Sequence, residues 1–264
     1  EYFSPLPSKT DKPAKKLALD FTRHIMGLIR GAKREVLLQT PYLVMSRRAQ
    51  HIFRTLHRRE DAPRIIVSTN SLASTDAFAV YAMSYKHRKR YLTKFGFEIH
   101  ELKPHAPGAA VDYELANLDA DKLIPPAETA SPASASRARL HLLGSSRASN
   151  RPAPLLSGGR RFGLHAKSIV VDDDFGMVGS HNFDPRSDHY NTESGVIVYD
   201  HAFADQLRRA ILRDTQPQNA WVIGPRQAVV PVLTDINQAI GTVSENLPLF
   251  DLWPFRYATS YDLK

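Results

Sequence analysis

Segments with helical spacing and segments with strand spacing alternate over the first hundred residues, and this order limits the fold more than any other feature. In order, we expect a helix over 14–34, a strand over 35–42, a helix that begins after Ser46, a strand over 64–69, a helix over 75–95 and a strand over 97–102. Ser46 can cap the second helix and Gly96 can end the third. This alternation predicts a sheet with helices on its faces.

Further strands are expected in the second half of the chain. The apolar segments lie at 162–171, 175–179 and 191–199, and the acidic run 172–174 can form the turn between the first two. Asp200 can cap a helix that follows the third strand. The second half therefore adds strands and a helix to the same kind of layered fold.

Two segments do not fit the alternation. Residues 105–160 are rich in Pro, Ala and Ser, so we expect a flexible insertion there. From 215 to 264 we expect a C-terminal extension, with one helix near 232–240 and an aromatic end. The sequence thus predicts one catalytic domain over 1–264 that carries an insertion and an extension.

Composition excludes some chemistry and favours one class of partner. The 264 residues include no cysteine, so disulfides, thiolate metal sites and a cysteine nucleophile are excluded. A formal net charge of +8 favours polyanions, either nucleic acid or an anionic lipid surface. The longest apolar stretches, such as 36–45, are too short and too interrupted to span a bilayer.

Four polar residues are spaced so that their side chains can converge. His165 and Lys167 are two positions apart in a strand-like run, so both should project from the same face. Ser180 and Asn182 repeat this spacing at the end of the next expected strand. An imidazole, an ammonium, a hydroxyl and an amide at one spot suit a phosphodiester, which needs a nucleophile or proton donor and donors for the phosphate oxygens.

Each side chain has an expected role. His165 attacks phosphorus or protonates the leaving oxygen, and Glu193, on the third expected strand, holds its other ring nitrogen. Lys167 and Asn182 bind the non-bridging oxygens, and Ser180 adds a hydroxyl contact to the substrate. Asp172 lies at the junction of strand and turn, away from the His165 face, so we interpret it as structural.

The residues and spacings together resemble a known signature, H-x-K-x₄-D-x₆-G-S-x-N, that of the phospholipase D superfamily. Its members here are His165, Lys167, Asp172, Gly179, Ser180 and Asn182. A chance match in a chain of this length is roughly one in 10⁵. Further segments are similar to the bacterial cardiolipin synthase branch, namely 40–42, 69–72, 75–76, 101–104, 182–187 and 191–193.

This resemblance implies an α/β fold, an α/β/α sandwich with a mixed β-sheet. It also implies a two-step displacement that needs no metal and no cofactor. A histidine of one signature forms a phosphohistidine intermediate, and a histidine of a second signature protonates the leaving alcohol. Gly179 and Asp172 would be the structural members of the signature.

The sequence holds a single signature, since the other histidines lack the lysine and aspartate partners. One explanation is that the chain is the C-terminal half of a two-signature enzyme, in which case His165 is the acid/base. The other is that two copies pair about a two-fold axis, so that either His165 can attack.

The leading hypothesis is phosphatidyl transfer between phospholipids, with the protein peripheral at the bacterial cytoplasmic membrane. The basic run 86–90 and the aromatic residues Trp253 and Phe255 are candidates for membrane contact. One alternative is a phosphodiesterase that cleaves nucleic acid, which is disfavoured because no nucleic-acid-reading module is visible. Another is an incomplete half-domain that only binds anionic lipid.

Overall fold

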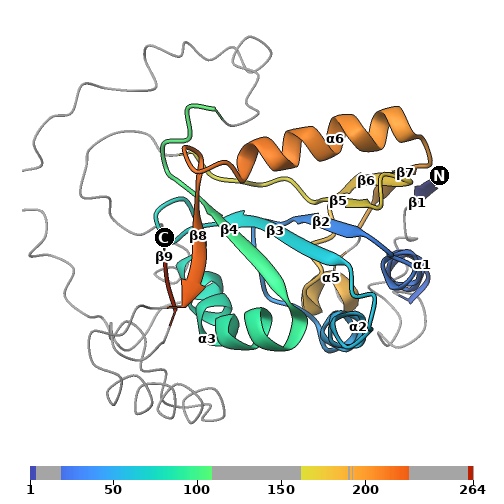
Figure 1. The fold of residues 1–264 in the computed structure, drawn as a ribbon, viewed down its shortest axis with the longest axis horizontal. Helices are drawn as coiled ribbons and strands as arrows, with labels where there is room; N and C mark the ends of the chain where they lie inside the picture. The colour runs from blue at the N-terminus through green and yellow to red at the C-terminus, as the bar shows by residue number, and fades with distance from the viewer. Residues whose placement is uncertain (4–18, 109–161, 190, 192, 226–260, 264) are drawn as a thin grey trace, which may run out of the picture.

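A computed structural model describes residues 1–3, 19–108, 162–189, 191, 193–225 and 261–263. The strands are β1 (Tyr2–Phe3), β2 (Glu35–Gln39), β3 (Arg64–Asn70), β4 (Phe97–Leu102), β5 (Ser168–Val171), β6 (Phe175–Gly179), β7 (Gly195–Val198), β8 (Ala220–Pro225) and β9 (Tyr261–Leu263). The helices are α1 (Leu19–Arg30), α2 (Arg47–His57), α3 (Phe78–Phe95), α5 (Pro185–His189) and α6 (His201–Asp214). In the described residues the strands form one mixed sheet in the order β1-β7-β6-β5-β2-β3-β4-β8-β9 (Figure 1).

The predicted alternation in the first hundred residues is confirmed. Strands β2, β3 and β4 are parallel and are connected by α2 and α3, whereas the other strand pairs are antiparallel. The Ser46 side chain caps α2 by accepting a hydrogen bond from the Ala49 backbone N–H at 3.2 Å. Gly96 ends α3 in the left-handed conformation, with φ of +66°, which glycine adopts without strain.

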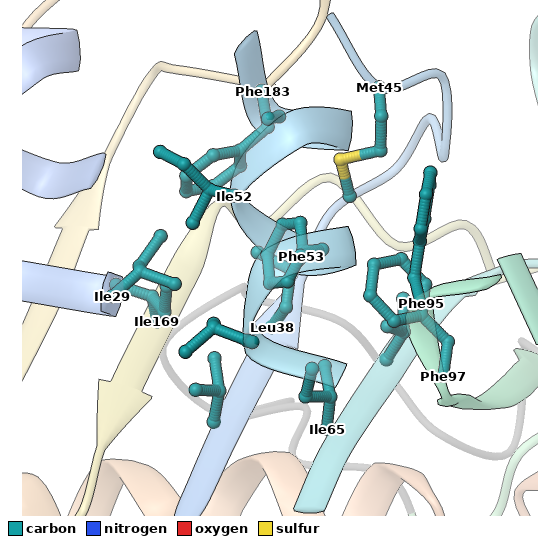
Figure 2. Close-up of a cluster of buried hydrophobic side chains, with 14 of the residues drawn as sticks. Ile29, Leu38, Met45, Ile52, Phe53, Ile65, Phe95, Phe97, Ile169 and Phe183 are labelled. Carbon is teal, nitrogen blue, oxygen red and sulfur yellow. The ribbon is translucent and has the colours of Figure 1, made fainter. Parts of the chain in front are cut away.

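Helices cover both faces of the sheet, so the fold is an α/β/α sandwich (Figure 1). Side chains alternate between the two faces along β2. Val36 and Leu38 join the larger apolar cluster, which includes residues of α1, α2 and α3, whereas Leu37 faces α6 and packs in a cluster with Ile211. Figure 2 shows the larger cluster, where Phe53 of α2 stands over the strands. The predicted fold class is therefore confirmed.

Two boundaries differ from the prediction. The extension expected from residue 215 begins later, because β8 pairs with β4 and belongs to the sheet. The insertion also begins later than residue 105, since Ala106 is buried beside Leu102 and Leu164. The backbone N–H of Phe162 donates to the carbonyl oxygen of Pro104 at 2.8 Å, so the chain leaves and re-enters the fold at one place. The rest of the insertion, the helix expected near 232–240, Trp253 and Phe255 lie outside the described residues.

The strand directions bring several chain segments to one edge of the sheet. The carboxyl end of β2 lies beside the amino end of β5, since Gln39 pairs with Ser168. Gly179 at the carboxyl end of β6 pairs with Gly195 at the amino end of β7. The carboxyl ends of the parallel strands β2 and β3 meet at this same edge, and such edges are where open α/β sheets bind ligands.

Candidate functional site

His165 and Lys167 lie at this edge but not within a strand, so the prediction that they share one strand is wrong. They precede β5, which begins at Ser168. A side chain far away in the sequence holds the residue before His165. The amide of Asn70 donates to the Leu164 carbonyl oxygen and accepts from the Leu164 N–H, both at 2.8 Å. These bonds satisfy the backbone of Leu164 and fix the residue before His165, whereas the Lys167 carbonyl oxygen accepts from the Gly179 N–H at 3.0 Å.

Lys167 is buried, with 8% of the residue exposed. Its Nζ donates to the backbone oxygen of His165 at 2.7 Å. Burial lowers the pKa of Lys167, and the carboxylates of Glu193, Asp76 and Asp184 oppose that shift. A buried ammonium among acidic groups is a strong point charge for an anion that reaches it.

Gly179 and Ser180 connect β6 to the segment before β7. A Cβ atom on Gly179 would lie 2.5 Å from the backbone oxygen of Ser194, so only glycine fits without moving the neighbouring strand. The Ser180 hydroxyl accepts from the Ser194 N–H at 2.9 Å and donates to Oε2 of Glu193 at 2.5 Å. The Ser180 hydroxyl is therefore already hydrogen-bonded within the protein both as a donor and as an acceptor.

The position and contact expected for Glu193 need correction. It precedes β7, which begins at Gly195, rather than lying on a strand. Its side chain is buried and is held by Ser180, and the described residues show no hydrogen bond between Glu193 and His165. Because Glu193 acts electrostatically on Lys167, its negative charge is still directed into the site.

Asn182 brings an unsatisfied amide to the site. Its Oδ1 is buried and has no hydrogen-bond partner in the described part of the chain, a state that costs about 1–3 kcal/mol. The next residue, Phe183, is fully buried with φ of +60°, which is a strained backbone for an aromatic residue. The surrounding fold thus holds this loop against local strain.

A buried histidine that the sequence analysis did not single out holds the same loop. Nδ1 of His181 accepts from the Phe183 N–H at 2.9 Å, so its proton resides on Nε2. Nε2 lies 3.1 Å from Oδ1 of Asp188 and 3.2 Å from the Thr22 hydroxyl. His181 therefore stabilises the loop of Asn182 from the protein interior and is not available to a substrate.

Asp172 lies at the other end of β5, away from this edge. Its carboxylate accepts hydrogen bonds from the backbone N–H groups of Lys33, Arg34 and Glu35 at 2.6–2.8 Å. Its φ is +54°. The carboxylate thus joins the β5–β6 turn to the start of β2, which fixes the strand that leads from His165.

An open cavity of about 400 Å³ adjoins His165. It is lined by Asn70, Ser74, Thr75, Asp76, Gly163, Leu164 and His165. Tyr42 lies beside it, with its ring edge-on to the His165 imidazole at a centroid distance of 6.4 Å. The Tyr42 hydroxyl donates to Oδ1 of Asp76 at 2.8 Å. The sequence analysis noted Tyr42 and Asp76 only within segments of family resemblance and assigned them no chemical role.

In the basic run 86–90, which was predicted as a membrane contact, Arg88 is buried and does not belong to an exposed surface. Arg88 in its centre is 5% exposed and forms an ion pair with Glu101, which is 2% exposed. The Tyr81 hydroxyl donates to the second oxygen of Glu101 at 3.0 Å, and the Arg88 guanidinium lies 4.5 Å from the centre of the Tyr85 ring. Arg88 is thus part of the interior.

A search for groups of three or more metal-ligating side chains finds none in the described residues. In the same residues no helix is both long and apolar enough to cross a bilayer.

The fold and the site define an α/β protein with a histidine, a buried lysine and an asparagine near one sheet edge. Residues 25–215 match the family described as "Cardiolipin synthase, PLD-like domain", and the chain belongs to this family.

Curated proteins and solved structures are similar to most of this chain. Cardiolipin synthase C of Escherichia coli K12 is 26% identical over 215 residues, which are 81% of this chain and 36% of that protein. An uncharacterized protein of Helicobacter pylori J99 is 25% identical over 230 residues, 87% of this chain and 36% of that protein. The chain thus spans about a third of the length of these curated relatives. Among solved structures, NucT from Helicobacter pylori is 11% identical with a TM-score of 0.49, covering 83% of this chain and 96% of that one.

Proposed function

We propose that this chain contributes the His165, Lys167 and Asn182 side of a site that transfers a phosphatidyl group from one phospholipid to the alcohol of another. The observation that supports the proposal is that His165, the buried Lys167 and Asn182, whose side-chain oxygen is buried without a hydrogen-bond partner in the described residues, lie on chain segments at one edge of the sheet. The Lys167 ammonium and the N–H₂ group of the Asn182 amide can donate to phosphate oxygens, whereas the unsatisfied Asn182 oxygen can only accept a hydrogen bond.

His165 is the reacting group in this mechanism. It is exposed to the cavity, and no hydrogen bond to its ring is present in the described residues. A ring nitrogen attacks phosphorus, the bond from phosphorus to the leaving alcohol breaks, and that oxygen takes a proton from a second acid. The acceptor alcohol then attacks phosphorus, gives up its proton, and the nitrogen–phosphorus bond breaks. If His165 is instead the acid, it supplies the first proton and receives the second.

The other side chains bind and orient. Lys167 and Asn182 stabilise the charge on the non-bridging oxygens as the five-coordinate transition state forms. Glu193 keeps Lys167 charged through its electrostatic effect. Ser180 positions Glu193 through their hydrogen bond, and a contact of its hydroxyl with the substrate would require it to exchange this partner.

The charge balance supports a second contributor to the site. Lys167 faces three carboxylates, those of Glu193, Asp76 and Asp184, and a phosphodiester adds a further negative charge. We therefore propose that a second signature supplies another histidine and lysine, either from the same longer protein or from a second copy of the chain. In the first case His165 is the acid/base; in the second either copy can attack.

The direct experiment is cardiolipin synthesis by the full-length protein. Vesicles of phosphatidylglycerol, with and without phosphatidylethanolamine, are supplied, and cardiolipin is measured by mass spectrometry. We expect product from the wild type, none from His165→Ala, and wild-type yield from the control His201→Ala, an exposed histidine at the start of α6. No product from the wild type, or equal product from His165→Ala, would contradict the proposal.

A peripheral position at the bacterial cytoplasmic membrane is part of the proposal. What supports it is helix α2, which has no acidic residue and exposes Arg47, Arg48, His51 and Arg58. Its first residues lie near the site edge, because the Ser46 N–H donates to the carbonyl oxygen of Phe183. Such a surface attracts anionic lipid at roughly 1 kcal/mol per basic residue.

The same basic surface, together with the net charge of +8, favours nucleic acid as the second candidate substrate. Cosedimentation with phosphatidylglycerol vesicles but no cleavage of single-stranded DNA supports the lipid enzyme. DNA cleavage that Lys167→Ala abolishes, with no phosphatidyl transfer, supports a phosphodiesterase acting on nucleic acid.

A further inference from the structure

The cavity beside His165 has a wall whose polar groups are mostly occupied. Both ends of the Asn70 amide bond to the backbone of Leu164. The Ser74 hydroxyl donates to Oδ1 of Asn70 at 3.1 Å, and the Thr75 hydroxyl accepts from the Ala77 N–H at 3.2 Å. The wall therefore offers a ligand few free groups, and the exposed carboxylate of Asp76 stands out among them.

One oxygen of Asp76 is oriented by the protein and the other is available. Oδ1 accepts the Tyr42 hydroxyl at 2.8 Å, and the described residues show no hydrogen bond to Oδ2. Burial and the Asp76 charge raise the pKa of the Tyr42 phenol to about 12. The phenol thus stays protonated and keeps donating at neutral pH, which fixes the carboxylate in one orientation.

The Asp76 carboxylate in this wall determines which part of a phosphodiester can enter the cavity. A phosphate group next to Asp76 would meet a like charge, whereas a hydroxyl or ammonium group can donate to Oδ2. The Lys167 ammonium, which is not among the residues that line this cavity, is the group that can attract the phosphate. A cavity of about 400 Å³ is near the lower end of small-molecule sites, roughly 300–1,000 Å³, and it suits a headgroup.

We infer that this cavity is the alcohol subsite of the reaction, and that Asp76, positioned by Tyr42, selects alcohols that carry a second hydrogen-bond donor. The inference rests on the proposed phosphatidyl transfer and adds to it the chemical class of the alcohol. Glycerol offers hydroxyl donors, ethanolamine offers an ammonium donor, and 1-propanol offers neither. Asp76 is a specificity-determining residue here, and Tyr42 is a positioning residue.

The experiment is a competition between alcohols in one reaction mixture. The full-length protein receives phosphatidylglycerol vesicles with equal concentrations of isotope-labelled glycerol, ethanolamine and 1-propanol, and the three phosphatidyl alcohols are measured by mass spectrometry. Hydrogen bonds to charged groups contribute about 1.5–3 kcal/mol, so we expect Asp76→Ala to lower the preference for donor-bearing alcohols over 1-propanol by about tenfold or more.

Matched variants separate the two donor types and exclude a general effect. Asp76→Asn keeps an acceptor without the charge, so it should retain much of the preference for glycerol and lose that for ethanolamine. Tyr42→Phe should lower both preferences less than Asp76→Ala does. Asp174→Asn removes an exposed carboxylate from the β5–β6 turn at the opposite edge of the sheet and should leave the product ratios unchanged.

The outcomes are distinguishable. A product ratio that falls in the Asp76 variants but not in Asp174→Asn supports the inference, whatever the total yield, because the ratio compares alcohols within one sample. A ratio that stays at the wild-type value in Asp76→Ala and Tyr42→Phe overturns the inference and leaves phosphatidyl transfer standing. If the wild type forms no phosphatidyl alcohol, the proposed function fails and the alcohol subsite fails with it.

Discussion

The substitution Gly179→Ala tests how closely β6 and β7 approach each other beside the site. The added Cβ would lie 2.5 Å from the Ser194 oxygen and 2.9 Å from the Gly195 Cα. Both are backbone atoms of the neighbouring strand segment, so no side-chain rotation can relieve the contact. Overpacking of this kind costs about 1–3 kcal/mol, and we expect the upper part of that range.

The magnitude can be measured by thermal unfolding. For a chain of this size, 2–3 kcal/mol corresponds to a fall in Tm of roughly 4–12 °C. Gly27→Ala is the matched control, because no heavy atom lies within 4 Å of its Cβ position and alanine is favoured over glycine in a helix by about 0.5–1 kcal/mol. Gly179→Ala should also lower turnover, since Ser180 and Glu193 move with the strands. A Tm for Gly179→Ala equal to that of wild type would refute the close approach.

Three further predictions concern single side chains. Asn182→Leu should lower turnover by about 10²-fold or more. The Tm should stay unchanged or rise, because the buried Asn182 oxygen has no hydrogen-bond partner to lose. A lowered Tm with normal turnover would make Asn182 a structural residue. Burial lowers the pKa of Lys167, so its ammonium should lose its proton at a pH below the ordinary lysine value of 10.5. The affinity of the protein for phosphate should fall over the same pH range. Phosphate affinity that persists above pH 10.5 would contradict this prediction. Arg88→Met leaves Glu101 buried without its cation, which should cost about 3–5 kcal/mol in urea unfolding, and adding Glu101→Gln should recover part of the loss.

Local signals explain which parts of the fold could be predicted from sequence. Ser46, Gly96 and Asp200 act on residues within a few positions of themselves, and the caps at all three are observed. Strand β4 was predicted with its observed bounds, because its alternation is complete within six residues.

Long-range partners explain what sequence reasoning missed. The backbone of Leu164, next to His165, is held by Asn70, a partner 94 positions earlier. Strand β8 has no strong pattern of its own and exists through pairing with β4. The spacing of His165, Lys167 and Asn182 identified the candidate site. The partner of Glu193 could not be read from spacing, because the Ser180 hydroxyl competes for the same carboxylate.

The most direct measurement is a crystal structure of the full-length protein with tungstate, a tetrahedral anion that can be located by its anomalous scattering. We predict tungstate at the sheet edge, with its oxygens within hydrogen-bond distance of the His165 ring, Lys167 Nζ and the Asn182 amide. Tungstate bound elsewhere, with these three side chains directed away from one another, would contradict the proposed chemistry.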